Sequence, residues 1–148
     1  MRLWHYKLLP FLDDFHIVAQ WRELLAIKGA IDKNGTPNHR LVNNVLDYSL
    51  YDFKKYMIMV VDEMKRRNLK FSTQKYVEFF NWECDRFPKP SIYDCLHNTP
   101  LFSGWHNVKY LRQCYYNLEE KHDCGIVSDG AWTKISQFYQ NKIKGESK

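Results

Sequence analysis

The stretch Asp13–Lys28, DDFHIVAQWRELLAIK, decides the fold class, because its apolar residues recur at helical spacing. An aspartate at 13 or 14 is expected to begin the helix by accepting hydrogen bonds from the free amides of the first turn. Gly29 is expected to end it. The residues that set the spacing are Phe15, Val18, Trp21 and Leu25 along one line, and Ile17, Leu24 and Ile27 along another.

The same helix carries polar residues at helical spacing. His16, Gln20, Glu23 and Ile27 share one face, at steps of four, three and four residues, and Arg22 projects beside Glu23. Two interpretations stay open. The face is the solvated side of an amphipathic helix, or it presents a carboxylate flanked by an imidazole and an amide for chemistry.

The rest of the chain also favours helices. Ser49 is typical of an N-cap, with a helix behind it to about residue 67, and shorter helical spacing follows at 73–82. Residues 1–11 are expected to be extended, and residues 32–40 and 84–104 to be loops. A third main helix is expected at 105–123, ended by Gly125. A last helix is expected at 129–143, capped by Ser128.

No segment shows the alternation of a strand, so we predict an all-α fold. We expect a compact single-domain bundle of three main helices plus an additional C-terminal helix, with the N-terminal segment packed against the first helix. The 148 residues are 45% hydrophobic and 16% aromatic, which suits one domain with a substantial core. No apolar run approaches the ~18 residues of a membrane helix. The sequence therefore predicts a cytoplasmic protein without a membrane partner.

The charge is unevenly distributed. The net charge is +5; residues 1–75 hold 13 Lys/Arg and 8 Asp/Glu, whereas residues 76–148 hold 9 of each. A basic half suggests a polyanionic partner, most simply nucleic acid, and an association with the nucleoid. The alternative is a basic face that only interacts with solvent.

Two motifs carry a resemblance to a known family. The opening Met-Arg-Leu-Trp is followed by His16, and then by Ala-Gln-Trp-Arg-Glu-Leu at 19–24. Together they resemble the pyrimidine dimer DNA glycosylases, the phage endonuclease V type and its cellular relatives. Residues 50–67 are similar as well, with a basic pair, an apolar run, a glutamate and Arg-Arg, and so are residues 38–43. The resemblance covers roughly residues 1–71.

The resemblance implies a DNA repair enzyme that acts through an N-terminal amine. In this family the amine attacks C1′ of a damaged nucleotide and forms a Schiff base, and Glu23 would be the assisting carboxylate. An α-amine has a pKa of about 7.7–8.0, against about 10.4 for lysine, so a useful share of it, roughly a tenth, is neutral near pH 7. Removal of Met1 is not expected before a residue as large as Arg2, which makes the Met1 amine the expected nucleophile; if Met1 is removed, the amine is that of Arg2. Lys7 is the fallback nucleophile.

The resemblance also implies double-stranded damaged DNA as the partner, bound by a monomer that needs no cofactor. Phage-type enzymes have an arginine where Ala26 stands here, and His39 and Arg40 are candidates to replace its phosphate contact. Trp4 is expected to anchor the N-terminal segment. The candidate DNA-binding residues are His5, His16, Gln20, Arg22, Lys28, His39, Arg40, Lys54, Lys55 and Arg66.

Two other functions stay open. One is a non-catalytic nucleic-acid binder on the same scaffold. The other is a zinc enzyme, although the spacing of its candidate ligands fits no standard zinc pattern and free thiols are the simpler interpretation. Those candidate ligands are Cys95, His97, Cys114, His122 and Cys124.

Overall fold

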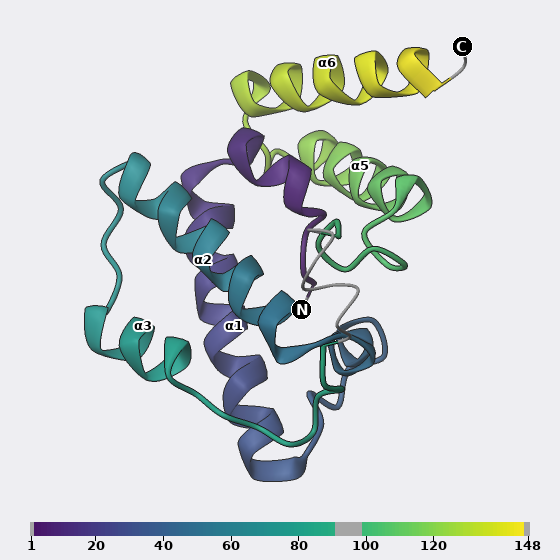
Figure 1. The fold of residues 1–148 in the computed structure, drawn as a ribbon. Helices are drawn as coiled ribbons and strands as arrows, with labels where there is room; N and C mark the ends of the chain where they lie inside the picture. Colours follow the sequence, from purple (N-terminus) through teal and green to yellow (C-terminus); the bar gives the residue numbers. More distant parts are fainter. Residues whose placement is uncertain (1, 91–98, 147–148) are drawn as a thin grey trace.

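The structure is a computed structural model that describes residues 2–90 and 99–146. Every regular element in these two ranges is a helix, which confirms the predicted all-α class (Figure 1). The elements are the 3₁₀ helix η1 (Tyr6–Phe11), α1 (Asp14–Asn34), the 3₁₀ helix η2 (Val42–Asp47), α2 (Leu50–Arg66), α3 (Thr73–Phe80), α5 (Val108–Asp123) and α6 (Asp129–Glu146).

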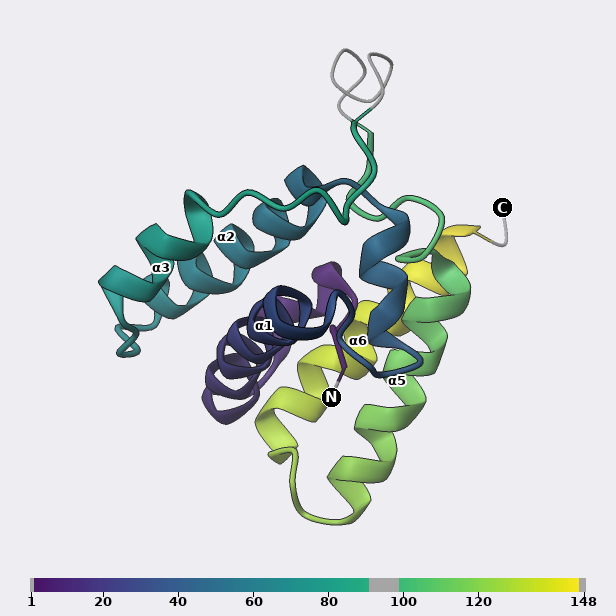
Figure 2. The same cartoon turned by 90° about the horizontal axis from the view of Figure 1, so that it is seen from below.

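Two helix pairs enclose the N-terminal segment. α1 packs along α2, with α3 against one flank of α1, and α5 packs along α6. η1 contacts both α2 and α6, so it joins the two pairs. In Figures 1 and 2 the first residues run between α1 and α5. The fold therefore places the start of the chain against the middle of α1.

The first helix is longer than the sequence predicts. It continues through Gly29 to Asn34, and Gly35, at a φ of 73°, ends it by donating its N–H to the Ile31 carbonyl at 2.8 Å. Buried Ile31 keeps the last turns packed, so a glycine at 29 does not stop the helix. The expectations of an end at Gly29 and of a loop from residue 32 are therefore wrong.

The start of α1 differs from expectation as well. Asp13 is its N-cap residue, but its carboxylate accepts no hydrogen bond from the first turn. It accepts instead from the Ser128 backbone N–H at 3.0 Å and from the Ser128 hydroxyl at 2.6 Å. Asp13 thus ties the start of α1 to the start of α6. The segment before it is also not fully extended, because residues 6–11 form η1.

The other predicted helices are confirmed, with ends shifted by at most three residues. Ser49 and Ser72 cap α2 and α3 by accepting from backbone N–H groups three residues on, at 3.2 Å each. The core lies between α1, α2 and the region around residue 102. Its largest fully buried side chains include Tyr56, Phe53 and Phe79. In the part of the chain that the structure describes, no helix is long and apolar enough to cross a bilayer.

Candidate active site and nucleic-acid interface

Glu23 lies against the start of the chain. Its Oε2 accepts a hydrogen bond from the Arg2 backbone nitrogen at 3.2 Å and another from the Gln20 side-chain amide at 3.2 Å. The Gln20 Oε1 in turn accepts from the Trp4 backbone nitrogen at 2.9 Å. Gln20 therefore aligns the segment and the carboxylate at once. Met1, named as a candidate nucleophile, lies outside the described residues.

Two tyrosines hold the same segment from opposite sides. The Tyr110 hydroxyl on α5 donates to the Leu3 carbonyl at 2.6 Å. The Tyr56 hydroxyl on α2 lies 2.8 Å from the Trp4 carbonyl and 3.0 Å from the Gln20 Oε1. Leu3 and Trp4 are buried, so the predicted anchoring role of Trp4 is confirmed. A chain end held in this way can keep a reactive group in place, which a frayed end cannot.

A pair of buried histidines continues the anchoring. The His5 Nε2 donates to the His106 carbonyl at 2.8 Å, and the His106 Nδ1 accepts from the Tyr6 backbone nitrogen at 3.2 Å. Burial lowers the pKa of His5 to about 4 and that of His106 to about 2, so both rings are neutral near pH 7. His5 is 2% exposed, so the structure places it inside the protein and not on a surface open to DNA.

The polar face of α1 points into the protein. His16 and Gln20 are 4% and 1% exposed, so the interpretation of this face as the solvated side of the helix is wrong. Among the described residues, neither ring nitrogen of His16 has a hydrogen-bond partner, and its ring meets Trp4 edge-on at 6.2 Å. Burial, reinforced by the charge of Lys121, lowers the pKa of His16. The solvent-exposed cation beside the site is Arg22.

The remaining predicted DNA-binding residues lie in three other places. Lys28 forms an ion pair with Asp32 at 2.7 Å, and its Nζ lies 5.0 Å from the centre of the Trp82 ring. On α2, Lys54 pairs with Glu83 at 3.4 Å, Lys55 is half-buried beside it, and Arg66 pairs with Glu63 at the far end.

Two further candidates lie in the turn before η2. His39 is half-buried there, and Arg40 is exposed. The structure brings Arg2, His16, Gln20 and Glu23 together, and not these residues.

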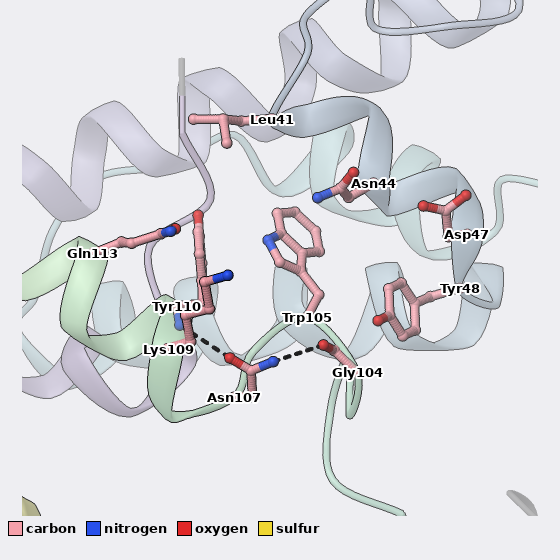
Figure 3. A pocket seen from close by; sticks show the side chains of 10 residues that line it. All are labelled: Leu41, Asn44, Asp47, Tyr48, Gly104, Trp105, Asn107, Lys109, Tyr110 and Gln113. Carbon is pink, nitrogen blue, oxygen red and sulfur yellow. Dashed lines mark hydrogen bonds between the residues drawn. The ribbon is translucent and has the colours of Figure 1, made fainter.

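A pocket of about 280 Å³ lies beside the N-terminal segment, between η2 and the start of α5 (Figure 3). Its Trp105 indole N–H is buried and finds no hydrogen-bond partner in the part of the chain that the structure describes. Tyr110 is 4% exposed and joins the pocket to Leu3. Sequence reasoning missed the pocket, because only the fold brings residues 41–48 to residues 104–113. It is lined by Leu41, Asn44, Asp47, Tyr48, Gly104, Trp105, Asn107, Lys109, Tyr110 and Gln113.

The candidate zinc ligands lie mostly apart from this site. Cys114 is buried on α5, and its thiol is close to Arg2 and Tyr110. Cys124 is exposed at the end of α5, and Cys95 and His97 lie outside the described residues. Within residues 2–90 and 99–146, no three His, Cys, Asp or Glu side chains are grouped as metal ligands would be.

Comparison with known proteins agrees with this geometry. Residues 1–77, just over half of the chain, match the family described as pyrimidine dimer DNA glycosylase. The match covers the N-terminal segment, α1 and α2, which hold Arg2, Gln20 and Glu23. Searches of curated proteins and of solved structures gave no significant match. The chain belongs to the pyrimidine dimer DNA glycosylase family, a family of DNA repair enzymes.

Proposed function

We propose that the protein is a DNA N-glycosylase with AP lyase activity, acting on pyrimidine dimers or related lesions in duplex DNA. One observation carries the proposal: the start of the chain is held with the Arg2 nitrogen 3.2 Å from the Glu23 carboxylate. Glycosylases that work through an amine need this nucleophile and a carboxylate on the same sugar. The Arg2 nitrogen is a peptide nitrogen while Met1 is attached, so the α-amine is either one residue away, on Met1, or at this position once Met1 is removed.

The chemistry begins at C1′ of the damaged nucleotide. The neutral α-amine forms a bond to C1′, and the C1′–N bond to the base breaks, with the electron pair and a proton leaving on the base. Opening of the sugar ring then gives a Schiff base between the amine nitrogen and C1′. Loss of a proton from C2′ allows the 3′ phosphate to leave, which cuts the strand by β-elimination.

Glu23 has two roles in this scheme. Its carboxylate stabilises the positive charge that develops on the sugar, and it transfers protons during ring opening and elimination. Gln20 and the Arg2 nitrogen both donate to Oε2, which fixes the direction of the carboxylate. We assign the nucleophile to the Met1 or the Arg2 amine. One residue spans at most about 3.6 Å, so retention of Met1 moves the amine no further than that from the Arg2 nitrogen.

DNA binding is assigned to Arg22, next to Glu23 in the sequence, and to cations elsewhere on the surface. Exposed Arg22 and Arg40 are suited to phosphates, and Lys54, Lys55 and Arg66 supply weaker contacts through their ion-paired or half-buried side chains. C1′ becomes accessible only when the nucleotide leaves the base stack. The pocket next to Tyr110 offers aromatic rings and amides to an extruded base. We expect a monomer to bind the lesion.

Borohydride trapping on duplex DNA with one abasic site tests the proposal. Reduction of the Schiff base should leave a covalent protein–DNA complex, and the yield should fall steeply in Glu23→Gln. Absence of a complex with wild-type protein that still binds the duplex would contradict the proposal. That outcome would support the second candidate, a non-catalytic DNA binder, which the basic first half and the large residue after Met1 favour.

A further inference from the structure

A second surface hollow lies on the opposite flank of α1 from the N-terminal segment. It runs between α1 and the residues that lead into α3, and it measures about 330 Å³. We call it the α1–α3 groove. It is lined by Val18, Trp21, Arg22, Leu25, Lys70, Phe71, Ser72 and Lys75.

The groove combines an apolar floor with positive walls. Trp21 and Phe71 meet edge-to-face at 6.3 Å on its floor. Arg22, Lys70 and Lys75 are exposed around it, and no carboxylate lines it. Among residues 2–90 and 99–146, none of these three cations is within ion-pair distance of a carboxylate, whereas Lys28, Lys54 and Arg66 all are. The groove therefore presents uncompensated positive charge.

Small residues connect the groove to Glu23. Arg22 and Glu23 are neighbours in sequence, and Ala19 and Ala26 lie one helical turn before and after both of them. Ala26 is exposed and Ala19 is half-buried, so the residues that flank this pair on the helix surface carry only methyl groups. A polyanion that lies over Glu23 can thus extend across this part of α1 to Arg22 and the groove.

We propose that the α1–α3 groove binds the phosphate backbone of the duplex beside the lesion, with Lys70 and Lys75 as phosphate contacts beyond Arg22. This inference rests on the proposed function for its ligand, because it takes the lesion to lie at Glu23. Charge complementarity identifies the occupant: three cations without carboxylates fit a chain of phosphodiesters. The two lysines hold the duplex in position and take no part in the chemistry.

The test is the salt dependence of binding to a duplex with one reduced abasic site, which cannot be cleaved. Each phosphate contact contributes about 0.9 to the slope of log K against log salt concentration. The double variant Lys70→Ser/Lys75→Ser should lower that slope by about 1.8. The matched control is Lys134→Ser/Lys144→Ser on α6, which removes the same charge from exposed positions outside the groove and should leave the slope nearly unchanged.

Duplexes shortened from one end or the other sharpen the test. Wild type and the groove variant should bind with equal affinity to a duplex that lacks the arm reaching the groove. They should bind with different affinities to a duplex that keeps this arm. Equal slopes for the groove variant and the control would overturn the inference. A loss of affinity that is the same for every duplex length would overturn it as well. The latter result would suit an acidic protein partner better. Borohydride trapping does not depend on this arm, so a failure of the groove is distinguishable from a failure of the proposed chemistry.

Discussion

The first 77 residues and the segment from 99 to 146 contribute differently to one site. The first part matches the family and holds Glu23, Gln20 and most of the net positive charge. The second part has six Lys/Arg and five Asp/Glu, a net charge of only +1, yet it supplies Tyr110 and the His106 backbone, which hold Leu3 and His5. The residues of the proposed chemistry thus lie in one region, and the position of the proposed nucleophile depends on both.

The chemical role of the first region is tested at the Glu23 carboxylate. Glu23→Gln keeps the size of the side chain but removes the charge and the proton-transfer group. Cleavage of abasic DNA should fall about a hundredfold or more, whereas the dissociation constant for the reduced duplex should change little. Single-turnover cleavage and fluorescence anisotropy measure the two quantities. Parallel losses of both would contradict a chemical role for Glu23.

The positioning role of the second region is tested at the Tyr110 hydroxyl. Tyr110→Phe keeps the ring but leaves the buried Leu3 carbonyl without its donor, at a cost of about 1–3 kcal/mol in unfolding free energy. Because the reactive end then shifts, cleavage should fall about tenfold or more while DNA binding persists. Tyr116→Phe, on the same helix but 55% exposed, is the control and should change neither. Cleavage at the wild-type rate in Tyr110→Phe would show that the first region positions its own nucleophile.

The His5–His106 contact between the two regions should make the free energy of unfolding sensitive to acid. The pKa values of His5 and His106 are about 4 and about 2 in the folded protein, below the ordinary 6.5. The unfolded chain therefore binds protons first as the pH falls below 6.5, and stability falls with it. Between pH 6.5 and about 4 each histidine should contribute up to about 1.4 kcal/mol per pH unit. Urea titrations across this range measure the slope, and His5→Gln should reduce it; an unchanged slope would contradict the buried neutral pair.

The smallest effects distinguish Gly29, inside α1, from Gly35, which follows its last residue. Gly29 lies inside the helix, where an added methyl group meets nothing within 4 Å, so Gly29→Ala should stabilise the fold by about 0.5–1 kcal/mol. Gly35 has a φ of 73°, so Gly35→Ala should destabilise it by about 1 kcal/mol. Thermal unfolding of both variants is the measurement. Shifts of the same sign would contradict the helix end at Asn34.

Short sequence patterns predicted most of the helices. They failed at helix ends whose position depends on contacts with residues far away in the sequence or buried in the core. Ser49, Gly125 and Ser128 mark helix ends through bonds to their own neighbours, and these ends agree with the structure. Gly29 was misread because burial of Ile31 extends α1 past it. Asp13 was misread because its partner, Ser128, lies 115 residues away.

The candidate site was predictable to the same extent. The spacing of His16, Gln20 and Glu23 placed them on one face, and that face points inward because the N-terminal segment covers it. No local pattern indicates that Tyr110 holds Leu3, or that Lys70 and Lys75 lie beside Arg22. Such contacts join segments far apart in sequence, and only the fold defines them.

The central claim is that the start of the chain, held against Glu23, is the nucleophile. Mass mapping of the borohydride-trapped complex on abasic DNA tests this most directly, because it identifies the nitrogen bonded to C1′. We expect an adduct on the α-amine of Met1 or Arg2, with a yield that falls in both Glu23→Gln and Tyr110→Phe. An adduct on the Lys7 side chain, or an α-amine adduct whose yield ignores both substitutions, would contradict it.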